Sequence, residues 1–312
     1  MARSGSVDFT DTKQSIIDDA AAAIGVRAIS AVLGADDNAL FGRLLNRLTK
    51  QYSGTIDFAP GQKEWTRRRA TLFLQKDQVE YSLGPTGDHA TDSYDETTLT
   101  AAANSTTLTV ASISGVSSGD YVGVILDSGR FHWTTVNGAP SGSTITLTTA
   151  VPSVASSGQP VYAYTTKMRR PLGVLTATLR DDETDTPIEI LSTVEKYDEI
   201  PDKFADGTPN KIYVEGQLDN AKAFIHYSPD DVSKLVKMTY LSPTEDFDGA
   251  SNNPDYPVEV YRALVFSLAV DAAPFYGRTV SPDLAALKTE SVTIAQNLYP
   301  ETCDLSFEPG KY

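Results

Sequence analysis

The sequence predicts an α+β protein in which a helical bundle is built from both chain ends and the region between them is rich in strands. Three observations support this prediction. Apolar residues repeat with a helical period near each end of the 312-residue chain. Between the two ends, the apolar pattern changes to a period of two, which is typical of strands. A Ser/Thr-rich segment at residues 95–167 interrupts the β-rich region, and we expect an inserted module there.

Two helices are expected at the N-terminal end. The first covers residues 12–33, and Gly25 marks the point at which it would be interrupted. The second covers residues 36–52, where Arg and Lys lie on or beside the face opposite the leucines. The two apolar faces are formed by Ile16, Ile17, Ala20, Ala21, Ala23 and Ile24 and by Leu40, Phe41, Leu44, Leu45 and Leu48.

Two more helices are expected at the C-terminal end. A Tyr-Pro pair at residues 256–257 opens the third helix, which ends before Pro274 because proline cannot continue a helix. The fourth begins at Pro282 and runs to residue 298. Ser281 precedes it and can accept a hydrogen bond from the free amides of the first turn.

The central region is predicted to form a β-sandwich. Its strands are recognised by β-branched and aromatic residues that alternate with polar ones. They lie at residues 65–74, 174–179, 211–214, 223–227 and 235–240, and five or more such strands can form two packed sheets.

The Ser/Thr-rich segment is predicted to be a small all-β domain. It contains 25 Ser or Thr among 73 residues and six charged residues. Its β-branched and aromatic residues alternate too regularly for a disordered linker. Turn signals at residues 127–129 and 137–138 separate strands that we expect at residues 106–113, 121–126, 131–136, 144–147 and 161–164.

The domain organisation follows from these patterns. We expect N-terminal bundle helices at 1–57, a central β-region at 58–94 and 168–255, the insert at 95–167, C-terminal bundle helices at 256–299 and a tail at 300–312.

Composition restricts the function. The net charge of −15 disfavours a protein that wraps DNA, because such binding needs clustered Lys and Arg. An acidic surface suits a channel wall past which DNA slides, and it also suits plain solubility. The single cysteine, Cys303, excludes a disulfide within the chain and a thiolate metal cluster. Neither a signal peptide nor an apolar run long enough to span a membrane is recognised, so we expect assembly in the cytosol.

Motifs for catalysis are weak. Residues 115–119, GVSSG, match the nucleophile-elbow pattern, but a strand rather than a helix is expected after Ser117. The three histidines, His89, His132 and His226, are far apart in the sequence. Acidic clusters at 181–185, 230–231 and 245–248 lack the spacing of a calcium loop, and no phosphate-binding Gly-rich loop is present. We therefore expect no enzyme activity, no catalytic residue, no metal site and no cofactor.

One dense basic cluster, Arg67, Arg68 and Arg69, lies on a predicted strand. Alternation would place Arg67 and Arg69 on one face together with Trp65, and Arg68 on the other. These arginines could pair with acidic groups of a partner subunit or of the same chain. They could equally keep a solvated edge strand from aggregating.

The order of several short motifs resembles the head-to-tail adaptor, or connector, proteins of tailed bacteriophages, especially the short-tailed ones. The resemblance covers most of the chain outside the insert. It rests on YSLGPTGD at 81–88, RPL at 170–172, ILS at 190–192, EKY at 195–197, GTP at 207–209 before Tyr213, and YP at 256–257.

The resemblance implies a helical bundle fused to a β-region and assembled as a ring beneath the portal, usually of twelve copies. The implied partners are other copies of the chain, the portal protein, tail or nozzle proteins, and packaged DNA that passes through the channel without sequence-specific binding. No membrane partner is implied, and the location would be the neck or tail of the virion. The insert departs from the family pattern and would project outward or toward the tail.

The interface residues that we expect are basic residues of the β-region and aromatic residues of the tail: Arg67, Arg68, Arg69, Arg169, Arg170, Phe307 and Tyr312. A second hypothesis is a peripheral tail or capsid protein with a carbohydrate-binding or adhesin-like β-module. It requires exposed rings on one face of the insert. The rings available are Tyr121, Phe131, Trp133, Tyr162 and Tyr164. A polysaccharide-degrading enzyme is a third hypothesis, which needs paired carboxylates in a cleft.

Overall fold

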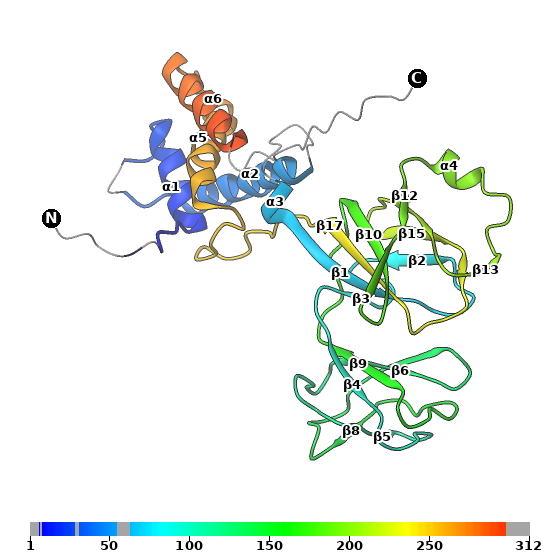
Figure 1. Cartoon of the computed structure of the whole chain (residues 1–312). Coiled ribbons are helices and arrows are strands. Elements are labelled where there is room, and N and C mark those ends of the chain that lie inside the picture. The colour runs from blue at the N-terminus through cyan, green and yellow to red at the C-terminus, as the bar shows by residue number, and fades with distance from the viewer. Residues whose placement is uncertain (1–5, 7, 29–30, 55–62, 298–312) are drawn as a thin grey trace, which may run out of the picture. The chain divides into compact units, whose positions relative to one another are not determined.

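The structure of the chain is a computed structural model. It describes residues 6, 8–28, 31–54 and 63–297 (Figure 1). The chain divides into two compact units. The first, here called the helical unit, comprises residues 1–66 and 243–312, and the second, here called the β unit, comprises residues 67–242. The α+β class predicted from the sequence is confirmed.

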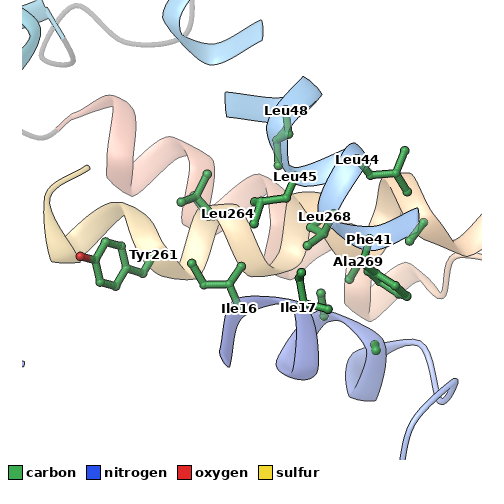
Figure 2. Close-up of a cluster of buried hydrophobic side chains, with 14 of the residues drawn as sticks. Ile16, Ile17, Phe41, Leu44, Leu45, Leu48, Tyr261, Leu264, Leu268 and Ala269 are labelled. Atoms are coloured by element: carbon green, nitrogen blue, oxygen red, sulfur yellow. The ribbon is translucent and has the colours of Figure 1, made fainter. Parts of the chain in front are cut away.

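Helix α5 forms the centre of the helical unit. It spans Tyr261–Ala272 and packs against α1 (Lys13–Ala23), α2 (Ala35–Gly54) and α6 (Pro282–Gln296). Helices from the two ends of the chain thus share one apolar core, in which Ile16, Ile17, Leu45, Leu264 and Leu268 meet (Figure 2). Because α5 has neighbours on several sides, it is apolar around most of its circumference.

Short elements complete the helical unit. α3 spans Lys63–Thr66, and two 3-10 helices, η1 (Val258–Val260) and η2 (Ala273–Tyr276), lie on either side of α5 in the sequence. The Ser281 side chain accepts a hydrogen bond from the Leu284 amide at 3.1 Å, so the predicted cap of α6 is confirmed.

Helix α1 ends at Ala23, next to the interruption predicted at Gly25, which is thus confirmed. The predicted end at residue 33 is wrong. Gly25 has a φ of +70°, a left-handed conformation that ends a helix at little cost for glycine. The Val26 amide donates to the Ala21 carbonyl at 3.0 Å and closes this turn.

The β unit contains a sandwich of two sheets around one core. The first sheet has the strand order β11 (Thr184–Pro187), β10 (Gly173–Asp181), β17 (Leu235–Leu241), β1 (Arg67–Phe73) and β3 (Ala90–Thr91). The second has the order β12 (Glu189–Leu191), β14 (Lys211–Glu215), β15 (Ala221–His226) and β2 (Glu80–Leu83). Pairing is antiparallel except between β12 and β14. Smaller elements are α4 (Val194–Asp198) and the parallel pair β13 (Asp206–Gly207) and β16 (Ser228–Pro229).

The Ser/Thr-rich insert folds as an all-β module within the β unit. Its larger sheet has the order β4 (Asp95–Thr98), β9 (Pro160–Tyr164), β6 (Tyr121–Ile125) and β7 (Phe131–Thr135). A smaller sheet pairs β5 (Thr107–Thr109) with β8 (Thr144–Thr146). Gly129 and Gly138 occupy the predicted turns with positive φ angles, as those turns require. Val122, Val124 and Val161 of the larger sheet share a core with Leu108 and Ile145 of the smaller one.

Candidate interaction surfaces

The serine motif does not have the geometry of a nucleophile elbow. Ser117 is exposed in a turn, and its amide donates to the Asp120 carboxylate at 2.7 Å. The chain then continues into strand β6, not into a helix. A nucleophile elbow holds its serine on a sharp turn between a strand and a helix, so Ser117 does not occupy one.

The histidines and carboxylates do not gather into one site. Among residues 6, 8–28, 31–54 and 63–297, no group of three or more His, Cys, Asp or Glu is placed to hold a metal ion. The helices of this same part of the chain include none that is long and apolar enough to cross a membrane.

The arginine cluster is divided between two environments. Arg68 pairs with Tyr240 of β17 in the strand register, and Arg69 pairs with Thr239. Alternation along β1 places Arg68 on the core side of the sheet and Arg69 on the outer side. The prediction that Trp65 shares a strand face with Arg69 is wrong. Trp65 lies in α3, and its ring packs against Tyr256 of the helical unit at a centroid distance of 6.2 Å.

The other predicted interface residues do not lie in the arginine cluster of β1. Arg170 donates to the Gln217 carbonyl at 3.0 Å, which ties the start of β10 to the loop after β14. The backbone of Arg169 is hydrogen-bonded to the buried Tyr240 hydroxyl. Phe307 and Tyr312 lie outside the described residues.

A polar groove of about 550 Å³ lies on the outer face of the five-stranded sheet. We call it the sheet groove; its charged lining residues are Arg69, Arg180, Lys237, Asp92 and Asp185. Arg180 and Asp185 form a two-point ion pair with both N–O distances at 2.6 Å. Lys237 donates to Thr71 at 2.9 Å and to Tyr94 at 2.7 Å.

The charge of the sheet groove is only partly balanced. Burial lowers the pKa of Lys237, and the nearby positive charge of Arg180 lowers it further. Arg69 is exposed and has no ion pair among the described residues. An acidic group of a partner could pair with Arg69 at this surface, and the pairing expected for the arginine cluster stays a prediction.

The aromatic rings of the insert are packed against the central sheet. Tyr162, Trp133 and Phe131 lie with centroids 5.1, 4.9 and 6.0 Å from the Phe73 ring of β1. Tyr164 stacks on the same ring at 6.1 Å. The exposed aromatic platform that the carbohydrate-binding hypothesis requires is thus not formed by these residues.

His89 extends this aromatic cluster. Its ring is stacked on Trp133 at a centroid distance of 4.1 Å, and its Nδ1 lies 2.6 Å from the Tyr164 hydroxyl. Burial lowers the pKa of His89 to about 3, and the positive charge of Lys167 contributes to this. The imidazole is therefore neutral at physiological pH and has a structural position between the insert and the sandwich.

We expect His89 to make the β unit sensitive to mild acid. In the unfolded chain His89 takes up a proton near pH 6.5, whereas in the folded chain it stays neutral down to about pH 3. Below pH 6.5 the unfolded state binds more protons, so the free energy of unfolding falls as the pH falls. Between pH 7 and pH 5 this contribution is about 2 kcal/mol.

The variant His89→Phe tests this expectation because it keeps a ring over Trp133 but cannot be protonated. The free energy of unfolding of both proteins is measured in urea at pH 7 and at pH 5. Between these two pH values, the wild type should lose about 2 kcal/mol more of this free energy than the variant does. Parallel pH profiles of the two proteins would contradict the assignment.

An apolar groove of about 630 Å³ lies on the helical unit. We call it the helix groove; it runs between the segment before α1, the C-terminal half of α1, and the start of α5. Two of its apolar lining residues are exposed: Phe9, whose relative exposure is 69%, and Val258. Other apolar lining residues are Tyr261, Val265 and Phe266, and the acidic ones are Asp11 and Asp19.

Further large apolar side chains are exposed on the helical unit. Phe275 of η2 is 60% exposed, and Ile294 of α6 is about half exposed. Neither these residues nor the helix groove was predicted from the sequence. One sequence signal was available for Phe275. Pro274 ends the helical pattern just before it, so no helical period predicts that Phe275 is buried.

The motif at 81–88, which contributes to the family resemblance, forms a closed turn. The Asp88 carboxylate accepts a hydrogen bond from the Ser82 amide at 2.7 Å, and the Asp88 amide donates to the Ser82 carbonyl at 2.7 Å. A Cβ atom at Gly87 would lie 2.2 Å from that carbonyl oxygen, so only glycine fits there. The residues of this motif thus have a local structural role.

Comparisons with known proteins leave the family open. No protein-family model matches the chain, and no curated protein matches its sequence. Among solved structures, it is similar to VP17, a capsid protein of bacteriophage P23-77, with 10% identity over 55% of this chain and 80% of that chain. The TM-score of 0.12 is too low to support an argument about fold or function.

Proposed function

We propose that this chain is a non-enzymatic structural protein of a phage virion, a head-to-tail adaptor that forms a ring between the portal and the tail. The supporting observation is the exposed apolar helix groove of the helical unit. Phe275 and Ile294 are further exposed apolar side chains elsewhere on the same unit. An exposed apolar groove is a typical place for another protein to bind.

The position of this surface in the fold supports the proposal. It belongs to the unit built from both chain ends, and the family resemblance assigns contacts with neighbouring copies and with the portal to these helices. A contact of modest area that repeats around a closed ring gives a stable assembly. Twelve copies are the expected number, because the family resemblance implies it.

The net negative charge of the chain is consistent with a ring whose lumen lets DNA pass. The net charge of −15 gives a surface that repels the phosphate backbone, so DNA can pass without being held. The glycan-binding hypothesis lacks comparable support, because the insert rings that would carry it lie in the cluster around Phe73.

Negative-stain imaging of the chain, alone and mixed with the portal ring of the same phage, tests the proposal. We expect an added ring of density with the portal's symmetry. A matched sample of portal alone defines the reference density. Absence of association in both conditions would overturn the adaptor function.

A further inference from the structure

The helix groove has acidic residues beside its apolar lining. Burial raises the pKa of Asp19, and the negative charges of Asp11 and Asp18 raise it further. Arg27 pairs with Asp18 at 3.2 Å, and its charge lowers the pKa of Asp19 by less than the other groups raise it. Arg262, the cation of the lining, is paired with Glu290 at 3.4 Å. A further cation brought by a partner would therefore be favourable beside Asp19.

A second exposed site lies just beyond the other end of α5. It consists of Phe275 and Arg278, and we call it the projection. Phe275 is exposed, and Arg278, three residues later, is exposed and has no ion pair among the described residues. The projection thus combines an apolar ring with a positive charge, whereas the helix groove combines apolar walls with negative charges. Each site thus has exposed apolar surface, and the charges beside the two are opposite.

The projection is held by its neighbours. The Tyr276 ring stacks on Phe41 at 5.8 Å, and its hydroxyl donates to Asp37 at 2.7 Å. Gly277 adopts a left-handed conformation with a φ of +61°, and the Arg278 amide donates to the Ala273 carbonyl at 3.0 Å. Because this turn is already ordered, little conformational entropy is lost when Phe275 binds a partner.

The projection and the helix groove belong to the same compact unit and are separated along α5. Phe266, at the groove, and Phe275 are nine residues apart, which corresponds to about 14 Å of helix. Two different patches that complement each other make a head-to-tail contact, and such contacts generate rings when the rotation closes.

We propose that neighbouring copies join head to tail, with Phe275 of one copy in the helix groove of the next and Arg278 beside Asp11 and Asp19. The occupant of the groove is thus a second copy of this chain. This inference rests on the proposed ring function and specifies its subunit contact.

Two complementary variants test the contact under the conditions in which the wild-type ring forms. Phe275→Asp removes the projection and leaves the groove intact. Val258→Asp places a charge in the groove and leaves the projection intact. Both side chains are exposed in the single chain, so both variants should fold, and circular dichroism checks this. We expect each variant alone to lose subunit affinity by at least about 30-fold and to fail to form rings.

Mixing the two variants distinguishes the contact from general loss of assembly. One intact projection and one intact groove remain, so an equimolar mixture should give 1:1 dimers in light scattering after size-exclusion chromatography. A mixture that stays monomeric would overturn the head-to-tail contact. The matched control Phe204→Asp changes an exposed ring of the β unit and should assemble like the wild type.

The outcomes separate this inference from the proposed function. If both variants still form rings on the portal, the subunit contact is overturned and the adaptor function stands. If the wild-type chain neither forms rings nor binds the portal, the adaptor function is overturned, and the contact with it.

Discussion

The substitution Phe73→Ala is expected to cost about 4 kcal/mol of the free energy of unfolding of the β unit. The Phe73 side chain is 1% exposed and lies at the centre of the rings that join the insert to the sandwich. Removing its ring leaves a cavity that the surrounding aromatic groups cannot fill, and it also removes the edge contact with Trp133 and the tilted ring contact with Tyr162.

Tryptophan fluorescence during urea unfolding measures this loss. The chain has two tryptophans, so in a Trp65→Phe background Trp133 alone reports the cluster. Phe204→Ala, at a side chain that is 73% exposed, is the matched control and should change the free energy of unfolding by less than about 0.5 kcal/mol. A loss below about 1 kcal/mol for Phe73→Ala would show that the cluster does not hold the insert.

The substitution Leu268→Ala is expected to cost about 3 kcal/mol in the helical unit. Leu268 is 0% exposed on α5, in the core where helices from both chain ends meet (Figure 2). The loss combines the transfer free energy of the missing carbon atoms with the cavity that remains between packed helices.

The reporter for this core is Trp65, which packs against Tyr256 of the same unit. In a Trp133→Phe background, the urea midpoint of the Trp65 signal should fall for Leu268→Ala. It should stay unchanged for Ile294→Ala, whose side chain is about half exposed on α6. Because Leu268 and Phe73 belong to different cores, Leu268→Ala should leave the Trp133 transition in place in the other background. Equal shifts of both signals would contradict separate cores.

Much of the fold could be predicted from the sequence because the signals are local. The 3.6-residue period of α2, the Ser281 cap with Pro282, and the glycines of the insert turns each act within a few residues. The alternation in β1, β10, β14, β15 and β17 likewise indicates strands without reference to partners. These preferences arise from backbone sterics and hydrogen bonding, which neighbouring residues decide.

The candidate surfaces could be predicted only in part. Arg69 was identified from its charge, but the groove that it lines with Arg180 and Lys237 joins three strands that are distant in the sequence. The helix groove depends on residues near position 9 and near position 261 that only folding brings together. Arg278 belongs to no motif, and the only sequence signal for Phe275 is the neighbouring Pro274, because exposed side chains leave no periodic pattern.

The α+β class, the helices at both ends and the folded Ser/Thr-rich insert follow from local sequence patterns. Which face of each element is covered depends instead on packing between distant parts of the chain. Trp65 shows this, since its helix and its Tyr256 contact replace the predicted strand position. The insert rings show it as well, because the same aromatic pattern serves an exposed platform or a buried contact. Burial depends on the surface that the rest of the chain presents, and that surface is set by long-range packing.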